Sequence, residues 1–172
     1  GILLEVGVLA HARLNLKEAA EIASSPANAR ITRERAVGGR PHPERGAELT
    51  RTQIAQGVDV VFAAAGTTGL GIMQAARDGG ILAIGVDSNQ NHLHPGTMLT
   101  SLVKRVDLAV EQAFAGVKPG VRSLGLKEGG VDWALDKDNQ ALITPQMKAA
   151  VEAAKAGINS GQIVVHDYMS NN

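Results

Sequence analysis

The chain has 172 residues, of which 44% are hydrophobic and 20% are charged, the balance of an ordinary globular protein. Its 17 lysine and arginine residues equal its 17 aspartate and glutamate residues. This zero net charge argues against a nucleic-acid-binding protein, because such proteins need excess cations to neutralise phosphates. Cysteine is absent, which excludes disulfides, thiolate metal sites and cysteine nucleophiles.

Short β-branched segments alternate with longer alanine-rich segments of helical period, which predicts an α/β protein with a largely parallel sheet. Continuous apolar runs are typical of strands covered on both faces, whereas the alternating segment 29–37 is typical of an edge strand. The predicted strands are 2–8, 29–37, 58–64, 81–86, 98–103, 121–127, 131–135 and 163–165. The predicted helices are 14–23, 43–56, 72–78, 104–115 and 145–160.

The last helix is the clearest predicted element. Thr144 is expected to cap its first turn, Pro145 to be its first residue and Gly161 to end it. An apolar stripe at helical spacing is expected to be buried. It consists of Met147, Ala150, Val151, Ala154 and Ile158.

Two loops follow the carboxyl ends of predicted strands, where open α/β sheets bind their ligands. The first contains Gly66 and Thr67, and its glycines would let the backbone approach a ligand. The loop lacks the lysine of a phosphate-binding loop, and its glycine spacing matches neither nucleotide fingerprint. A tight strand-to-helix turn without a ligand is the alternative interpretation.

The second loop begins at Asp87, directly after a buried strand, where a carboxylate needs hydrogen-bond partners. Lys104 ends the next strand, so the two charged groups could hold a polyol, such as a sugar, from two sides. His92 and His94 suggest a metal, but a tetrahedral site needs three or four ligands, so exposed surface histidines are favoured. No metal is therefore expected.

Catalysis is not expected, because the sequence has no serine in a nucleophile elbow, no thiol and no paired carboxylates in matching loops. Asp132, Asp136 and Asp138 surround Trp133 but do not match a calcium-loop pattern. We interpret them as acidic residues that solvate a loop while the tryptophan packs. No cofactor is expected either.

Five stretches resemble, in the same order, the basic membrane protein family, the substrate-binding lipoproteins of nucleoside-type ABC importers. They are VDVVFAAAGTTGLGIMQAA, ILAIGVDSNQNHLHPG, TMLTSLVKRVDLAVEQAF, LGLKEGGVDWALD and ITPQMKAAVEAAKAGI. They cover most of the chain from about Pro43 to its end, whereas residues 1–36 keep only the family's order of strand, helix, proline and strand. GVDSNQ, TSLVKRVD and LKEGGV are specific only in combination.

The resemblance implies an α/β fold: a three-layer parallel-sheet lobe of the type I periplasmic-binding-protein kind, with carboxy-terminal segments of a second, incomplete lobe. Residues 1–103 would form the ligand-binding lobe, and residues 104–172 the crossover and the remaining segments of the other lobe. Asp87 and Lys104 match the family's ribose-binding carboxylate and ammonium. Gly66 with Thr67 matches the glycine-rich turn that lines the pocket.

By the same resemblance, the ligand would be a purine nucleoside or purine base, taken up without catalysis. The partner would be an ABC importer permease, and nucleic acid is not expected to bind. The protein would be periplasmic or a membrane-anchored lipoprotein, with its signal segment outside this chain.

Two alternative functions are an enzyme with a nucleotide cofactor and a regulatory domain. A small Rossmann-like enzyme would use the turn at 66–71 for a nucleotide cofactor with Asp87 about twenty positions on, but the glycine spacing disagrees. A ligand-sensing regulatory domain would share the two-lobed fold. Because the segments after about Lys104 would lack neighbouring strands, the stripe of the last helix should be covered by association, either by swapping the terminal segments between copies or by packing with the missing half of the protein.

Overall fold

The structure is a computed structural model, and the residues it describes are 29–32, 42–116, 120 and 122–165. The strand predicted at 2–8 and the helix predicted at 14–23 lie outside these residues.

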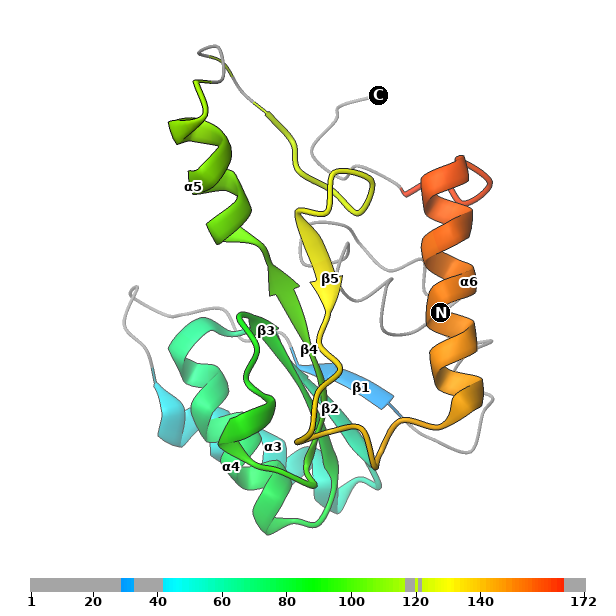
Figure 1. Ribbon diagram of the computed structural model, residues 1–172. Coiled ribbons are helices and arrows are strands. Elements are labelled where there is room, and N and C mark those ends of the chain that lie inside the picture. The colour runs from blue at the N-terminus through cyan, green and yellow to red at the C-terminus, as the bar shows by residue number, and fades with distance from the viewer. Residues whose placement is uncertain (1–28, 33–41, 117–119, 121, 166–172) are drawn as a thin grey trace.

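The described strands form one five-stranded sheet in which spatial order follows chain order (Figure 1). The first four strands run parallel, and the last is antiparallel to the fourth, which confirms the predicted largely parallel sheet. The strands are β1 (Ala29–Thr32), β2 (Val60–Ala63), β3 (Leu82–Asp87), β4 (Met98–Lys104) and β5 (Val131–Trp133).

Helices connect most of these strands. The α-helices are α3 (Pro43–Ala55), α4 (Gly69–Asp78), α5 (Val106–Phe114) and α6 (Pro145–Ser160). Two short 3-10 helices are η2 (Gly66–Thr68) and η3 (Asn91–Leu93). The connection from β3 to β4 contains η3 in place of an α-helix, so a polar loop returns along the sheet there.

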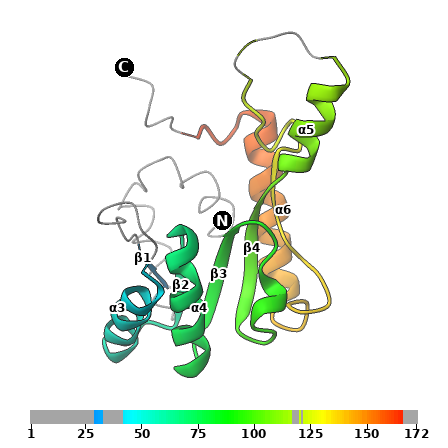
Figure 2. The same cartoon turned by 90° about the vertical axis from the view of Figure 1, so that its left-hand side faces the viewer.

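The sheet is covered on both faces, which gives the three layers predicted. Alternate side chains of a strand point to opposite faces of the sheet, so the central strands contribute residues to two apolar clusters, one on each face. On one face Val61 and Met98 are buried against α4, which packs beside α3. On the other face Phe62 and Leu99 are buried against Val151 of α6. Figure 2 shows α3 and α4 on one side of the sheet and α6 on the other.

The ends of α6 follow the predicted capping chemistry. The Thr144 hydroxyl accepts a hydrogen bond from the Met147 amide at 3.1 Å, and Pro145 occupies the first helical position. Gly161 ends the helix in the left-handed conformation with φ 78°, which glycine adopts at no steric cost. This helix was therefore predicted correctly from its sequence.

Two predicted strands are wrong. Residues 122–127 form no strand; the Gly125 amide instead donates to Glu128 at 2.9 Å, and the Gly130 amide donates to the Gly125 carbonyl. Residues 163–165 are not a strand either, because Ile163 donates its amide to the Gly157 carbonyl and packs against the end of α6. The backbone bonds just named are local and close turns instead of pairing strands.

The apolar stripe of α6 is partly buried against the sheet of the same chain, which corrects the expectation that association alone would cover it. Val151 is 2% exposed, and Ala154 and Ile158 pack against the same core. Met147 remains 40% exposed, and Ala150 is also exposed.

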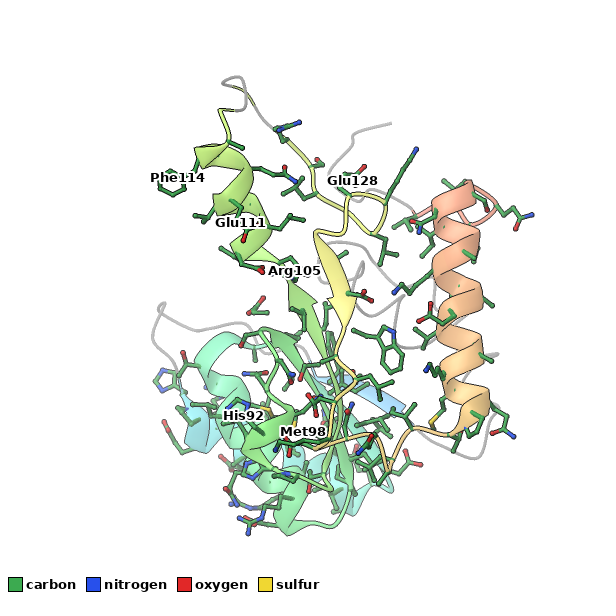
Figure 3. All side chains as sticks on the ribbon, viewed as in Figure 1. His92, Met98, Arg105, Glu111, Phe114 and Glu128 are labelled. Carbon is green, nitrogen blue, oxygen red and sulfur yellow. The ribbon has the colours of Figure 1, made fainter. Side chains whose placement is uncertain are left out.

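Helix α5 has the opposite character. Its apolar residues Val106, Val110 and Phe114 are 64%, 49% and 89% exposed. Phe114 points away from the rest of the molecule, and α5 lies beyond the carboxyl end of β4 (Figure 3). No helix among the described residues is both long and apolar enough to cross a membrane.

The close packing of α3 against α4 generates a stability prediction. A Cβ built on Gly71 would overlap the backbone carbonyl of Pro43, whereas one on Gly69 would lie 3.1 Å from the Ala63 carbonyl oxygen. We expect Gly71→Ala to lower the free energy of unfolding by at least about 1–3 kcal/mol. The backbone of Pro43 cannot move aside for the new methyl group as a flexible side chain could. Gly69→Ala should cost clearly less. Urea unfolding of both variants would check this, and equal effects would contradict it.

Candidate functional site

Three parallel strands end side by side at one edge of the sheet. β2 pairs with β3 and β3 with β4, so the loops after Ala63, Asp87 and Lys104 are neighbours. Adjacent strands lie about 4.8 Å apart, so side chains from these loops can contact a single small molecule. The sequence-predicted site residues all lie at this edge.

The glycine-rich turn follows β2. Gly66 has φ +54°, a left-handed conformation that favours glycine, and both Gly66 and Thr67 are exposed to solvent. The buried Thr68 hydroxyl accepts a hydrogen bond from the His42 amide at 3.0 Å. This bond fixes the turn to the start of α3. The α4 helix begins at Gly69, three residues earlier than predicted.

Asp87 and Lys104 form an ion pair across the ends of β3 and β4. Asp87 pairs with Val103 in the sheet register, which places Lys104 one residue further along β4. The Lys104 Nζ lies 2.6 Å from Asp87 Oδ1, with side chains 43% and 57% exposed respectively. A pair this exposed stabilises the fold by at most about 1 kcal/mol. Both groups are therefore available to hydrogen-bond a ligand instead.

The backbone of Asp87 is unusual. Its φ of 69° is the only positive value at a non-glycine residue in the part of the chain that the structure describes. Aspartate tolerates this conformation better than most residues, yet it still stores strain that the surrounding structure must offset. The Ser88 amide donates to the Val86 carbonyl at 2.8 Å, which closes a tight turn around Asp87.

Gln90 holds this turn against the sheet. Its side-chain Oε1 accepts a hydrogen bond from the Val86 backbone amide at 2.9 Å. Its backbone amide donates to Ser101 Oγ at 2.9 Å. Gly85 makes room for it, since a Cβ on Gly85 would lie 2.6 Å from Gln90 Oε1.

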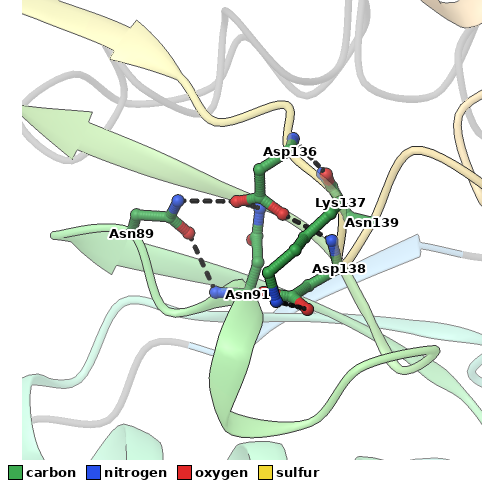
Figure 4. Close-up of polar contacts among 6 residues, drawn as sticks. All are labelled: Asn89, Asn91, Asp136, Lys137, Asp138 and Asn139. Atoms are coloured by element: carbon green, nitrogen blue, oxygen red, sulfur yellow. Dashed lines mark hydrogen bonds and ion pairs between the residues drawn. The ribbon is translucent and has the colours of Figure 1, made fainter.

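A network of polar side chains continues from this loop to the segment after β5 (Figure 4). Ser101 Oγ donates to Asn91 Oδ1 at 2.8 Å, and both residues are fully buried. Asn91 Nδ2 and Asn89 Nδ2 both donate to Asp136 Oδ2, at 3.0 and 2.6 Å. The other oxygen of Asp136 accepts from the Asp138 amide at 2.8 Å.

Asp136 was interpreted from the sequence as a solvating loop residue, and that interpretation is wrong. The carboxylate is the hydrogen-bond acceptor on which two asparagines of the neighbouring loop converge. The DKDN segment indicates only a local turn, since an aspartate commonly accepts from the amide two residues further on. Its long-range partners cannot be read from local sequence.

The sequence raised His92 and His94 as possible metal ligands. No group of three or more histidine or acidic side chains able to hold a metal occurs among the residues that the structure describes. Burial, and then the nearby positive charge of Arg77, lower the pKa of His94.

Solved structures of solute-binding and regulatory proteins share the fold of this chain. The chain resembles the solved structure "ABC transporter system solute-binding proteins from Aeropyrum pernix K1", with a TM-score of 0.72, 19% identity, and coverage of 98% of this chain and 65% of that one. It also resembles a transcriptional activator of the comK gene from Bacillus halodurans (TM-score 0.62, 22% identity, 77% and 47% coverage). At these identities the likeness establishes the fold, which transport and regulatory proteins share.

The family follows from the sequence. Residues 31–166 match the family described as "ABC transporter substrate-binding protein PnrA-like", and the chain belongs to it. It is similar to Basic membrane protein D of Borreliella burgdorferi, with 40% identity over 48% of this chain and 27% of that protein. It is also similar to the CD4+ T-cell-stimulating antigen of Listeria monocytogenes, with 32% identity over 71% of this chain and 40% of that protein. The chain thus spans less than half the length of these curated relatives.

The hydrogen bonds at Asp136 generate a prediction about pH. The bond from Asn89, followed by those from the Asp138 amide and Asn91, lowers the pKa of the Asp136 carboxyl despite its burial. Because the folded pKa lies below the unfolded value of about 3.9, ionised Asp136 stabilises the fold above that pH. The contribution is lost as the pH falls through the folded pKa.

We therefore expect Asp136→Asn to be less stable than the wild type near pH 7, with a gap that narrows as the pH falls below about 4. Urea unfolding across this range would measure the gap. A gap independent of pH would show that the carboxylate charge at this position does not contribute.

Proposed function

We propose that this chain provides the ligand-binding edge of an ABC-importer substrate-binding protein whose ligand is a purine nucleoside or purine base. The observation that carries the proposal is the half-exposed Asp87–Lys104 pair at the carboxyl edge of the sheet. Membership of a family of ABC transporter substrate-binding proteins supports the transport role. The nucleoside identity of the ligand rests on the family resemblance of the residues around Asp87 and Lys104.

The chemistry of the pair suits a ribose diol. The Asp87 carboxylate can accept hydrogen bonds from two hydroxyl groups, and the Lys104 ammonium can donate to a hydroxyl oxygen. Each is a charge-assisted hydrogen bond, stronger than one between neutral groups. Because the ion pair between them is exposed and weak, a ligand can insert without a large loss of stability. The turn at Gly66 and Thr67 would line the same pocket through its backbone.

In this proposal residues 1–103 form the ligand-binding lobe, and residues 104–172 the crossover and the remaining segments of a second lobe. The placement of α5 beyond the end of β4 supports such a division (Figure 1). The protein acts without catalysis, and its partner is an importer permease. An extracytoplasmic, membrane-anchored location is supported by relatives such as an uncharacterized lipoprotein of Pyrococcus furiosus, 42% identical over 47% of this chain.

We expect Asp87→Ala and Lys104→Ala each to weaken the binding of adenosine or guanosine to the full-length protein. A hydrogen bond to a charged group contributes about 1.5–3 kcal/mol, so affinity should fall about tenfold to over a hundredfold. Calorimetric titration would measure the affinities. His92→Ala and His94→Ala are the controls and should bind as the wild type does. Wild-type affinity in both test variants would contradict the site.

We also propose that the purified chain associates with itself through α5. Its stripe of Val106, Val110 and Phe114 is apolar and exposed in the part of the chain that the structure describes, and a second copy of the chain can cover it. Light scattering at micromolar concentration should report a mass above that of one chain. Phe114→Asp should lower the mass, whereas Glu111→Ala, on the same helix, should not. A stable wild-type monomer would contradict the proposal.

A further inference from the structure

We propose that Asp136 is a positioning residue that holds the Asp87 turn in its ligand-binding geometry, acting through the side chains of the loop 89–91. The proposal rests on the function proposed above for Asp87. Asp136 lies outside the four predicted site residues and is not expected to contact the ligand itself.

The connection from Asp136 to Asp87 can be followed bond by bond. Asp136 binds the side chains of Asn89 and Asn91, and Asn91 accepts from Ser101. Ser101 in turn accepts from the Gln90 amide, while Gln90 Oε1 accepts from the Val86 amide. Val86 immediately precedes Asp87. Every residue from 89 to 91 is therefore fixed on the carboxyl side of the strained turn.

The far end of the network is itself anchored to β4. Asn139 is fully buried; its Nδ2 donates to the carbonyls of Leu99 and Ala134 at 2.9 Å each. Its Oδ1 accepts from the Asp136 amide at 2.8 Å. Thr100 also donates to the Ala134 carbonyl, at 2.7 Å. Asp136 thus fixes the Asp87 turn to the same strand that ends in Lys104.

The position requires a carboxylate. One oxygen of Asp136 accepts two side-chain amides, and the other accepts a backbone amide. An asparagine there would have to turn its own NH₂ group toward one of these donors, because it carries only one acceptor oxygen. Alanine would remove all three bonds and leave the buried Asn91 amide without its acceptor.

The test compares Asp136→Ala with Thr50→Val in the full-length protein. Thr50 is also fully buried, and its hydroxyl donates to the Gly46 carbonyl at 2.8 Å within α3, far along the chain from the loop. It therefore controls for the general loss of a buried hydrogen bond. Hydrogen exchange of the amides at 86–91 is measured first, because this measurement needs no ligand.

We expect Asp136→Ala to accelerate exchange at 86–91 at least tenfold relative to Thr50→Val, whereas Thr50→Val should act mainly on α3 and on α4, which packs against it. Should Asp136→Ala fail to fold, Asn89→Ala removes the bond to Asp136 and the bond that Asn89 Oδ1 accepts from the Asn91 backbone amide. Because Asn89 is exposed, this variant should accelerate exchange at 86–90 to a smaller degree, and residue 91 is left out of the comparison. Unchanged exchange at 86–91 in the folded variants would overturn the positioning role.

Binding of adenosine and guanosine supplies the second measurement. Asp136→Ala should weaken binding about tenfold, and it should have little further effect in an Asp87→Ala background, because two residues that act through one contact are not additive. Equal effects in both backgrounds would overturn the proposal. If the wild type binds neither nucleoside, the proposed ligand is wrong, and the exchange measurement alone decides whether Asp136 holds the turn.

Discussion

The parallel pairing of β3 with β4 is the constraint on which the candidate site depends. The register opposes Asp87 to Val103, so the next residue of β4, Lys104, lies beside the carboxylate that ends β3. A shift by one residue would move every side chain of β4 to the opposite face of the sheet, so the apolar residues that now pack against the helices would lose their partners. The register is set by apolar side chains packed against helices on both faces. The packing of the apolar core therefore also places the charge pair at the end of the strands.

The loop between these strands has to meet two demands. It must return along the sheet so that β4 can run parallel to β3, and it must leave Asp87 at the ligand edge. The polar segment 88–97 does this without an α-helix, and its backbone is held by side chains rather than by a helical ladder. The cost is a positive φ at Asp87. The hydrogen bonds of Gln90 and Asn91 offset it.

Local sequence predicted the elements whose stability is local or depends only on burial. The apolar segments predicted β2, β3 and β4. The capping pattern at Thr144 and Gly161 predicted both ends of α6. It failed for 122–127, where the Gly125 and Gly130 amides bond within a local turn, and for 163–165, where the Ile163 amide bonds to the Gly157 carbonyl. Strand formation requires a partner strand, and a short apolar segment does not indicate whether one is present.

The same distinction applies to the site and to the two last helices. Asp87 and Lys104 could be identified because both follow predicted strands, whereas Asp136 could not, because its partners lie more than forty residues away in the chain. Helices α5 and α6 both carry apolar residues at helical spacing. Only α6 is covered, because periodicity defines a face and tertiary structure decides what packs on it.

A crystal structure of the full-length protein with bound adenosine or guanosine tests the central claim most directly. The account predicts the ribose at the carboxyl edge of β2, β3 and β4, with its hydroxyl groups within hydrogen-bond distance of the Asp87 carboxylate and the Lys104 ammonium. The Asp87 turn should keep the backbone conformation it has without ligand. A nucleoside bound elsewhere, with Asp87 and Lys104 still paired only to each other, would contradict the account.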